Sequence, residues 1–495
     1  MVALGKIKTI RAVPFALLGL VLGARSSAQQ FNAFVLKALA TPEGRRQAVV
    51  DSFLRTLPSA PVIEADTLVH FVYAGGGSRV TLAGDMNQWD PNAWPLKNIP
   101  GTNFWYRTAS FEKDARLDYK FVVDGSTWLL DPRNPYQIRG GFGPNSELRM
   151  PGYIPPPEIE YRADIPHGSL HDTVLTSTYL GNSRLVRVYT PPGYEAGAEL
   201  YPLLLVHDGL DYINLAQAPN VLDNLIAEGR IQPLVAVFVP PVDRNPEYAG
   251  GRKAAFSHFI VDELMPYLYR RYRVRREANA HAVLGASNGG NISLYLAVHY
   301  PDVFANVAAQ SSNVEAEISS ALRDGPTLPL RFYLDLGTYD IPLLIRLVRE
   351  LVLILQARGY PLRYAEYHEG HSWGNWRAHL DDALEFFFPG PALGVGDRGS
   401  LPARFALLEA YPNPTRAHSR IAIRTEGRES FELVLYDLQG RCVRIWREDF
   451  PLSAEHTLTW DGRDSAGVPV PSGVYICRLS TPGGRSATAR IVLLR

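Results

Sequence analysis

The alternation of apolar and polar positions divides this chain into three parts. Between Thr67 and Met150, short β-rich runs alternate with period two and are broken by Gly, Asn, Asp and Pro, a pattern typical of antiparallel strands joined by turns. Between Tyr161 and Phe388, apolar strand-like runs instead alternate with helical stretches, which predicts a mostly parallel sheet with helices on both faces. Residues 405–495 return to period two, so we expect an α/β domain between two all-β domains.

The connecting segments set the expected boundaries. Thr41-Pro42-Glu43 places a capping residue and a proline at the start of a helix. A proline-rich connector follows Met150, and PGPALGVGDRGSLP, which begins at Pro389, has the composition of a flexible linker. The predicted parts are a helical segment at 29–66, a β-sandwich at 67–152, an α/β domain at 153–392, a linker at 393–404 and a second β-sandwich at 405–495.

The charge balance argues against one large class of function. Fifty basic and fifty acidic residues give a formal net charge of zero. Such a chain has no net field that would attract nucleic acid or an anionic membrane surface. We therefore expect no nucleic-acid partner.

The first residues have the pattern of a secretory signal peptide. Basic residues up to Arg11 precede an apolar stretch from Ala12 to Ala24, and the small residues Ser27-Ala28 follow it. An uncleaved membrane anchor is the alternative. About thirteen apolar residues are, however, fewer than the roughly twenty that span a bilayer. We expect a signal peptide at 1–28, a secreted or cell-surface protein and no stable membrane span.

The chain has only two cysteines, Cys442 and Cys477. A disulfide between them and two buried free thiols are both compatible with an exported protein, and this choice stays open. Neither arrangement predicts a metal site or a catalytic thiol. We expect no metal and no cofactor.

Residues 284–290, LGASNGG, contain a candidate nucleophile. The pattern Gly-x-Ser-x-Gly around Ser287 follows a strand-like run and precedes a helix-compatible run, as in a nucleophile elbow. Glycines are needed two residues before and after the serine because side chains there would clash in so tight a turn. A serine at a helix N-terminus is well placed for chemistry that develops negative charge.

A serine nucleophile needs a base and an acid, and both follow in the expected order. Asp340 ends the strand-like run RFYLDLGTYD, and His371 follows PLRYAEYHEG. Asp335 is the alternative acid, but it lies in the middle of its strand. His368 is the alternative base, and the spacing of HEGH does not fit the helical zinc motif His-Glu-x-x-His.

The oxyanion donors are expected from two backbone segments. One is the N–H of Asn288, directly after the nucleophile. The second comes from the turn after the strand-like run in LLLVHDGLDY, where Gly209 and Leu210 are equal candidates.

The α/β region resembles the esterase D and enterochelin-esterase-like branch of the α/β-hydrolases, which includes feruloyl and acetylxylan esterases. The resembling stretches are VHDGLDY, RNPEYAGGRKAAFSHFIVDELMPYL, LGASNGG, LDLGTYD and EGHSWGNWR. The resemblance implies an α/β-hydrolase fold, the triad Ser287, Asp340 and His371, and a cofactor-free acyl-enzyme mechanism. Trp373 and Trp376 are expected either to stack on an aromatic or sugar substrate or to pack in the core under a loop.

The first β-sandwich resembles family 48 carbohydrate-binding modules and the glycogen-binding domain of the AMP-activated kinase β subunit. The resembling stretches are GDMNQWDP, LDYKFVVDGSTWLLDP and GFGPNS. The resemblance implies an Ig-like (E-set) sandwich with glycan contacts at Trp89, Lys120, Trp128 and Asn145. The last loop is one residue shorter than in the kinase subunit, which weakens the match at Asn145. A domain that packs beside the active site without binding glycan is the alternative.

The C-terminal sandwich resembles the Ig-like sorting domains of type IX secretion and, equally, flagellar-hook-capping-type Ig-like domains. The shared stretches are YPNP, YDLQGR, WDGRDSAGVPVPSGVY and ARIVLLR. The first resemblance implies a partner in the secretion machinery, and the second implies an adhesive sandwich.

Together these features predict a secreted serine esterase. The expected substrate is a feruloyl or acetyl ester on polysaccharide. A siderophore trilactone of the enterochelin type is the alternative within the same chemistry. A non-catalytic surface protein that binds glycan is the alternative of another class.

Overall fold

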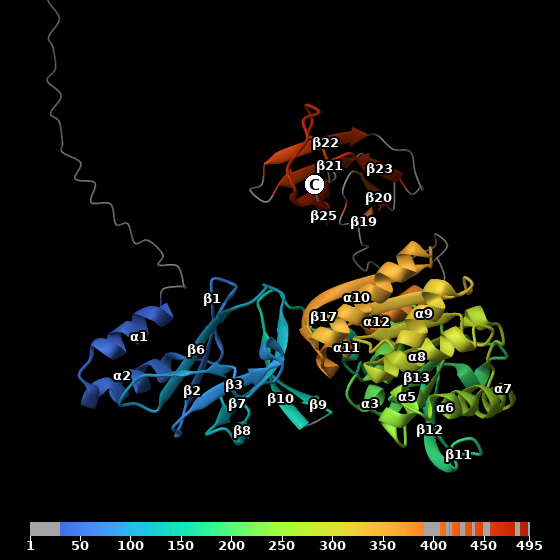
Figure 1. Ribbon diagram of the computed structural model, residues 1–495, viewed down its shortest axis with the longest axis horizontal. Coiled ribbons are helices and arrows are strands. Elements are labelled where there is room, and N and C mark those ends of the chain that lie inside the picture. The colour runs from blue at the N-terminus through green and yellow to red at the C-terminus, as the bar shows by residue number, and fades with distance from the viewer. Residues whose placement is uncertain are drawn as a thin grey trace, which may run out of the picture. The chain divides into compact units, whose positions relative to one another are not determined.

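The computed structural model describes residues 30–141 and 143–390 and, nearer the C-terminus, residues 406–411, 415, 418–425, 431–437, 441–448, 456–480 and 486–493. The predicted signal peptide at 1–28 and the predicted linker at 393–404 lie outside these residues. The chain forms two compact units, one within residues 1–392 and one within 393–495. The N-terminal sheets and the α/β region therefore belong to one unit (Figure 1).

The first unit begins with two helices that cover a small sheet. Helices α1 (Gln30–Ala40) and α2 (Glu43–Thr56) pack through Phe31, Phe34 and Val50 onto Val72 and Phe104 of the sheet. The strand order of this sheet is β1 (Val62–Glu64), β2 (Leu68–Ala74), β6 (Phe104–Ser110) and β5 (Lys97–Asn98). Strand β1 lies within the segment predicted as helical over 29–66, because its short apolar run pairs with β2 instead of continuing the helices.

A second N-terminal layer packs on the first. Its strands are β3 (Val80–Gly84), β4 (Trp94–Pro95), β7 (Arg116–Val123), β8 (Thr127–Leu129), β9 (Gln137–Gly140) and β10 (Gly143–Arg149). Phe71 of β2 and Leu82, Tyr119 and Phe121 of this layer are fully buried in one shared core. The period-two pattern of the sequence thus corresponds to two sheets that bury one face each against the other.

The central region has a mixed sheet in which the parallel strands dominate. Antiparallel strands β11 (Ser169–Ser177) and β12 (Asn182–Thr190) form one end. The parallel strands follow in the order β14 (Val235–Val239), β13 (Leu203–His207), β15 (His281–Ala286), β16 (Asn306–Gln310), β17 (Arg331–Tyr339) and β18 (Leu362–Gly370). The prediction of a mostly parallel sheet with flanking helices therefore describes this core, and the antiparallel end makes the sheet mixed.

Helices cover both faces of this sheet, each with its own apolar cluster. One face carries α5 (Arg244–Ala249), α6 (Lys253–His258), α7 (Met265–Arg271), α8 (Asn288–His299), α9 (Ala316–Asp324) and α10 (Pro342–Ala357). The other face carries α3 (Gly209–Asn214), α4 (Ala218–Ala227), α11 (Trp373–Ala378) and α12 (Leu380–Phe387). Alternate residues of the strands enter the two clusters, as the pleat requires.

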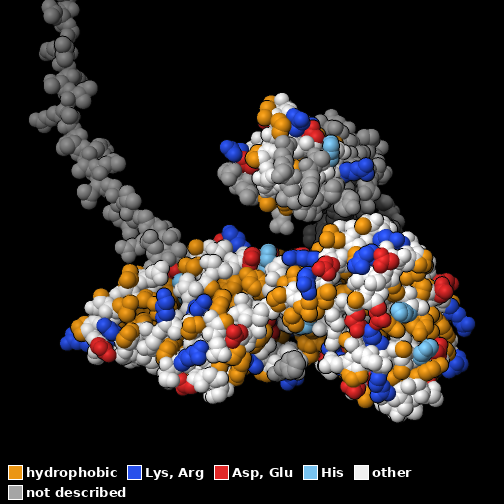
Figure 2. All heavy atoms as spheres, in the orientation of Figure 1, with side chains coloured by type: hydrophobic (Ala, Val, Ile, Leu, Met, Phe, Trp, Pro, Cys, Tyr) orange, Lys and Arg blue, Asp and Glu red, His pale blue; other side chains and the backbone are white. Residues whose placement is uncertain are grey.

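The central sheet continues into the N-terminal region. Strand β18 pairs with β7 in parallel at Glu369 and Arg116, and the joined sheet has 14 strands. The segment that follows β18 therefore leaves the central sheet directly beside the N-terminal strands. In the face shown in Figure 2, basic and acidic side chains are interspersed over this unit.

The described residues of the second unit form two small sheets. One has the order β19 (Ala406–Tyr411), β20 (Ser419–Thr425), β23 (His456–Trp460), and the other has the order β22 (Cys442–Glu448), β21 (Phe431–Asp437), β24 (Gly473–Ser480), β25 (Ser486–Leu493). Cys442 is exposed, Cys477 is buried, and the two thiols are unpaired. Burial raises the pKa of Cys477 to about 12.

No helix among the described residues combines the length and the apolar character needed to cross a lipid bilayer.

Candidate active site

Ser287 occupies a strained turn between β15 and α8. Strand β15 ends at Ala286, helix α8 begins at Asn288, and Ser287 has φ 56° and ψ −122°. Such a backbone conformation costs a non-glycine residue about 1–3 kcal/mol and persists only where neighbouring structure holds it. Here the Ser287 N–H donates to the Gln310 carbonyl at 2.9 Å, and the Asn313 N–H donates to the Ser287 carbonyl at 3.2 Å.

The two glycines of the motif around Ser287 have no room for a side chain. A Cβ on Gly285 would lie 2.3 Å from the Gly289 carbonyl oxygen, and a Cβ on Gly289 would lie 2.9 Å from Asp208 Oδ2. Neither distance is compatible with a side chain. The steric reason predicted for the spacing is therefore present within the turn at Gly285, whereas at Gly289 it comes from Asp208, after β13.

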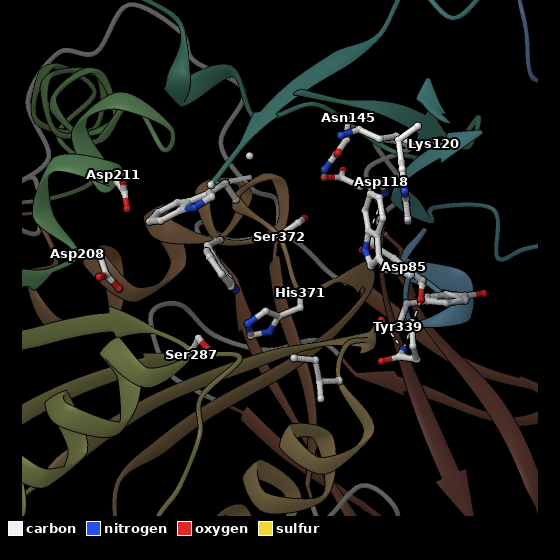
Figure 3. Close-up of a pocket in the computed structure, with 18 of the residues that line it drawn as sticks. Asp85, Asp118, Lys120, Asn145, Asp208, Asp211, Ser287, Tyr339, His371 and Ser372 are labelled. Atoms are coloured by element: carbon white, nitrogen blue, oxygen red, sulfur yellow. Dashed lines mark hydrogen bonds between the residues drawn. The ribbon is translucent and has the colours of Figure 1, made fainter. Parts of the chain in front are cut away.

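His371 and Asp340 form a hydrogen-bonded pair in reach of the same pocket as Ser287. His371 Nδ1 lies 2.8 Å from Asp340 Oδ1, and Asp340 is almost fully buried at 1% exposure. The Ile341 N–H also donates to Asp340 Oδ1, at 2.6 Å. Ser287 and His371 both line the pocket shown in Figure 3. The structure thus places the predicted nucleophile, base and acid at the ends of β15, β18 and β17.

The alternative acid and base have other partners. Asp335 accepts a hydrogen bond from Gln310 Nε2 at 2.9 Å, and burial raises its pKa to about 7. His368 Nδ1 lies 2.7 Å from Asp114 Oδ1, in the N-terminal region. His368 and His371 therefore contact different carboxylates, which does not fit a shared metal.

The two predicted oxyanion segments are both helix N-termini. Asn288 opens α8 and Gly209 opens α3, so the N–H groups of Asn288, Gly209 and Leu210 precede the first intrahelical hydrogen bonds. Gly209 is sterically required, because its Cβ would lie 2.4 Å from the Phe238 backbone. Whether Gly209 or Leu210 supplies the second donor stays a prediction.

Arg244 is a pocket residue that the sequence analysis missed. Its guanidinium donates two hydrogen bonds to Asp208, at 2.8 and 2.7 Å, and a third to the Ala286 carbonyl at 3.3 Å. It therefore braces the residue directly before the nucleophile. Asp211 also lines the pocket, and burial together with the Asp208 charge raises its pKa. The sequence signals were their positions after the C-terminal ends of β14 and β13 and their place in the resembling stretches RNPEYAGG and VHDGLDY, where neither was given a role.

The pocket lies between the N-terminal region and the central sheet and has a volume of about 810 Å³. All four residues predicted to contact glycan line it, namely Trp89, Lys120, Trp128 and Asn145. They lie in the same pocket as Ser287 and His371, as Figure 3 shows for Lys120 and Asn145. The N-terminal region therefore forms a wall of the candidate active site.

Two of these residues are oriented by buried carboxyl groups. Trp89 Nε1 donates to Asp85 Oδ1 at 2.9 Å, and Asn145 Nδ2 donates to Asp118 Oδ2 at 3.0 Å. Burial, reinforced by the Asp118 charge, raises the pKa of Asp85 to about 8. Trp128 is less constrained, with 43% of its surface exposed.

The chain is similar in sequence to known esterases. Residues 177–387 match the family model described as "Putative esterase". An uncharacterised Bacillus subtilis protein is 24% identical over 234 residues, which is 44% of this chain and 97% of that protein. The iron(III) enterobactin esterase of Dickeya dadantii is 25% identical over 361 residues, covering 62% of this chain and 81% of that protein.

The fold is also shared with a solved structure. The crystal structure of the enterobactin esterase from Shigella flexneri superposes with a TM-score of 0.58 at 23% identity, covering 68% of this chain and 97% of that one. The endo-1,4-beta-xylanase/feruloyl esterase of Xylanibacter ruminicola is 27% identical over 156 residues, which is 29% of this chain and 22% of that protein. The central region is an esterase-type α/β-hydrolase.

Two tryptophans of the esterase domain form a packed wall beside the histidine. Trp373 and Trp376 are 7% and 6% exposed and belong to the core cluster on one face of the sheet. The Trp376 ring meets the His371 ring edge to face at 5.0 Å, and Trp373 meets Tyr212 at 5.1 Å. Both also line the pocket, so packing accounts for most of each ring and leaves a small part of it accessible.

Proposed function

We propose that Ser287 is the nucleophile of a carboxylic-ester hydrolase, with His371 as its base and Asp340 as the group that orients His371. His371 takes the hydroxyl proton as Ser287 attacks the ester carbonyl. The N–H of Asn288 and that of Gly209 or Leu210 stabilise the oxyanion. Water, activated by His371, then releases the acid from the acyl-enzyme. The hydrogen bond between His371 and Asp340, beside the pocket that holds Ser287, is the observation that carries this proposal.

We infer that the preferred substrate is a feruloyl or acetyl ester carried on a polysaccharide. Trp89 and Trp128 are aromatic surfaces on the side of the pocket away from the central sheet, and Lys120 and Asn145 add polar contacts. Aromatic faces with a few polar groups suit sugar rings and cinnamoyl groups better than they suit ions. One continuous pocket would hold the acyl group near Ser287 and the glycan against the N-terminal wall.

The charges of the pocket support an uncharged ligand. Asp208 pairs with Arg244, and Asp118 pairs with Arg116. The raised pKa of Asp85, about 8, leaves this carboxyl mostly protonated at pH 7. Of the remaining charges, the positive charge of Lys120 offsets the negative charge of Asp211, so the net charge of the lining is close to zero.

A siderophore trilactone is the second candidate. The similarity to iron(III) enterobactin esterases extends over more of the chain than the esterase domain, at 62% for the Dickeya protein. A ferric catecholate is multiply anionic, and Arg244, one of the lining cations, is already engaged by Asp208. The near-neutral lining therefore favours the polysaccharide ester.

We also propose that the protein is exported. The signal-peptide pattern at 1–28 supports export, and the resemblance of the C-terminal residues to sorting domains supports a partner in the secretion machinery. Both fit a substrate outside the cell.

A side-by-side turnover assay tests function and substrate together. The full-length protein and its Ser287→Ala variant are compared on methyl ferulate, acetylated xylan and a catecholate trilactone. Release of ferulate or acetate by the wild type alone is the expected result. Turnover that persists in Ser287→Ala would refute the nucleophile assignment, and a strong preference for the trilactone would replace the polysaccharide ester by the second candidate.

A further inference from the structure

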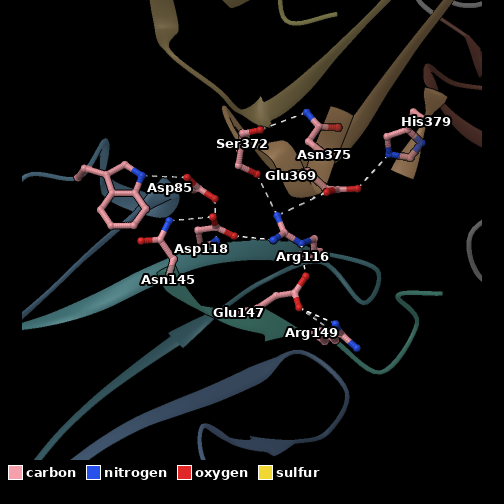
Figure 4. Close-up of polar contacts among 12 residues, drawn as sticks. Asp85, Arg116, Asp118, Asn145, Glu147, Arg149, Glu369, Ser372, Asn375 and His379 are labelled. Carbon is pink, nitrogen blue, oxygen red and sulfur yellow. Dashed lines mark hydrogen bonds and ion pairs between the residues drawn. The ribbon is translucent and has the colours of Figure 1, made fainter. Parts of the chain in front are cut away.

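The loop that carries His371 is held from the N-terminal region by Arg116. Arg116 lies on β7 and is fully buried. Its Nη1 donates to Ser372 Oγ at 3.0 Å and lies 3.8 Å from Glu369 Oε2. These two residues lie on either side of the Gly370-His371 pair, so one guanidinium contacts the histidine loop on both sides of His371 (Figure 4).

Arg116 is itself fixed in place by carboxylates of its own region. It donates to Asp118 Oδ1 at 2.6 Å and to Glu147. Glu147 is in turn bound by Arg149 at 2.6 Å. A planar guanidinium with bonds in several directions has little freedom to rotate. Arg116 is therefore a rigid support and not a mobile surface charge.

The glycines of the histidine loop are shaped to receive the N-terminal side chains. A Cβ on Gly374 would lie 2.0 Å from Arg116 Cζ. A Cβ on Gly370 would lie 2.1 Å from Asp85 Cγ. Each glycine thus leaves space that a side chain of the N-terminal region fills, so that region packs directly on the backbone of the histidine loop.

The loop that carries Asp340 has a matching contact. Gln88 Nε2 donates to the Asp340 carbonyl at 3.1 Å and lies 3.4 Å from the Tyr339 carbonyl. Gln88 and Trp89 both have left-handed φ values, 58° and 59°. Two consecutive residues of this kind are costly and persist where surrounding contacts determine them. The turn thus presents Gln88 to the acid loop and Trp89 to the pocket.

We propose that the N-terminal region positions both loops of the triad, Gln88 through the Asp340 loop and Arg116 through the His371 loop. This inference rests on the proposed roles of Asp340 and His371. The N-terminal sheets act on catalysis with any ester, including one too small to reach Trp128. Gln88 and Arg116 touch the loops and not the reacting atoms, so they are positioning residues.

A matched pair of glutamine variants tests the acid loop in the full-length protein. Gln88→Asn shortens the side chain by one methylene and so moves the amide away from the Asp340 carbonyl. Asparagine also tolerates the left-handed backbone at this position. Gln217→Asn is the control, because Gln217 has φ 55° and donates its amide to the Asn214 carbonyl, away from the pocket. With 4-nitrophenyl acetate we expect Gln88→Asn to lower kcat about fivefold, the effect of one lost hydrogen bond, with KM and Tm as in the control.

A matched pair of serine variants tests the histidine loop. Ser372→Ala removes the acceptor of Arg116 Nη1 but leaves the charged partners of Arg116 in place. Ser257→Ala is the control, because the Ser257 hydroxyl is buried and has no hydrogen-bond partner among the described residues. We again expect about a fivefold lower kcat with unchanged KM and Tm.

The proposed positioning can be tested separately for each loop. Equal kcat values for Gln88→Asn and Gln217→Asn would overturn positioning of the acid loop. Equal kcat values for Ser372→Ala and Ser257→Ala would overturn positioning of the histidine loop. Failure of the proposed function has a different signature, which is turnover that survives Ser287→Ala.

Discussion

The turn of Ser287 and the loop of His371 are supported by contacts from different parts of the molecule. Each presents one reactive side chain at the C-terminal end of a parallel strand, and each depends on glycines. In the Ser287 turn, the atoms that exclude a side chain at Gly285 belong to the turn itself, at 2.3 Å from the Gly289 carbonyl, and Asp208 of the same domain confines Gly289. At His371, they belong to Asp85 and Arg116 of the N-terminal region.

This difference separates local from remote support of an active site. The nucleophile turn takes its contacts from β15, α8, β16 and the Asp208–Arg244 pair, all within the esterase domain. The histidine loop takes its shape from contacts between residues 256 positions apart, such as Arg116 and Ser372. Damage to the N-terminal region should therefore affect the histidine and acid loops while the nucleophile turn stays intact.

The largest expected effect comes from the nucleophile itself. Ser287→Ala should lower kcat by about 10⁴-fold or more, because no other group can form the acyl-enzyme. A fluorophosphonate probe should label the wild type and not the variant, and Tm should stay close to the wild-type value. Ser257→Ala is the control for loss of a serine hydroxyl. Labelling that survives Ser287→Ala would place the nucleophile elsewhere.

Gly374→Ala should disturb the contact between Arg116 and the His371 loop. The added Cβ would run into the Arg116 guanidinium, and a displacement of about 1 Å at a catalytic group can lower kcat about 100-fold. Gly44→Ala is the control, because a Cβ at Gly44 meets nothing within 4 Å. Both variants are assayed on 4-nitrophenyl acetate with Tm measured in parallel. A kcat equal to that of the control would show that the histidine loop does not depend on Arg116.

His207 should make the esterase domain sensitive to acid. Burial, together with the Arg244 charge, lowers the pKa of His207 to about 3 from its ordinary 6.5. The unfolded chain then binds a proton that the native state does not, so this contribution to stability is full above pH 6.5 and is lost as the pH falls toward 3. The slope is about 1.4 kcal/mol per pH unit.

Urea unfolding of the wild type and His207→Leu at several pH values measures this slope. Neither ring nitrogen of His207 has a hydrogen-bond partner among the described residues, so leucine should flatten the pH dependence at little cost. In His281→Leu, the comparison variant, two hydrogen bonds to backbone carbonyls are lost and stability should fall. An unchanged slope in His207→Leu would assign the acid sensitivity to other groups.

The smallest expected effect concerns the outer wall of the pocket. Trp128→Ala should raise KM for a polymeric ester about three- to tenfold through lost stacking, with a smaller effect on 4-nitrophenyl acetate. Tyr136→Ala is the control, because Tyr136 is a similarly exposed aromatic residue at 47% and is not part of the pocket lining. Equal KM values for the two variants on the polymer would remove Trp128 from the substrate site.

Particular residues show how far local patterns reach. The order of Ser287, Asp340 and His371 along the chain predicted a pairing that the structure contains for the last two. The pattern favoured Asp340 over Asp335 because Asp335 lies in the middle of its strand, and in the structure it is Asp340 that lies 2.8 Å from His371. Arg244 was given no role because it appeared only as the first residue of a long resembling stretch, although it binds Asp208 and the Ala286 carbonyl.

The sequence by itself determined what depends on neighbouring residues. Periodicity specified the strands and helices, and glycine spacing specified the Ser287 turn, because both follow from sterics and burial within a few residues. Only the tertiary structure decided that Trp89, Lys120, Trp128 and Asn145 share a pocket with Ser287, and that Arg116 supports the His371 loop. Those relations depend on the pairing of β7 with β18, and no local pattern encodes a contact between strands so far apart along the chain.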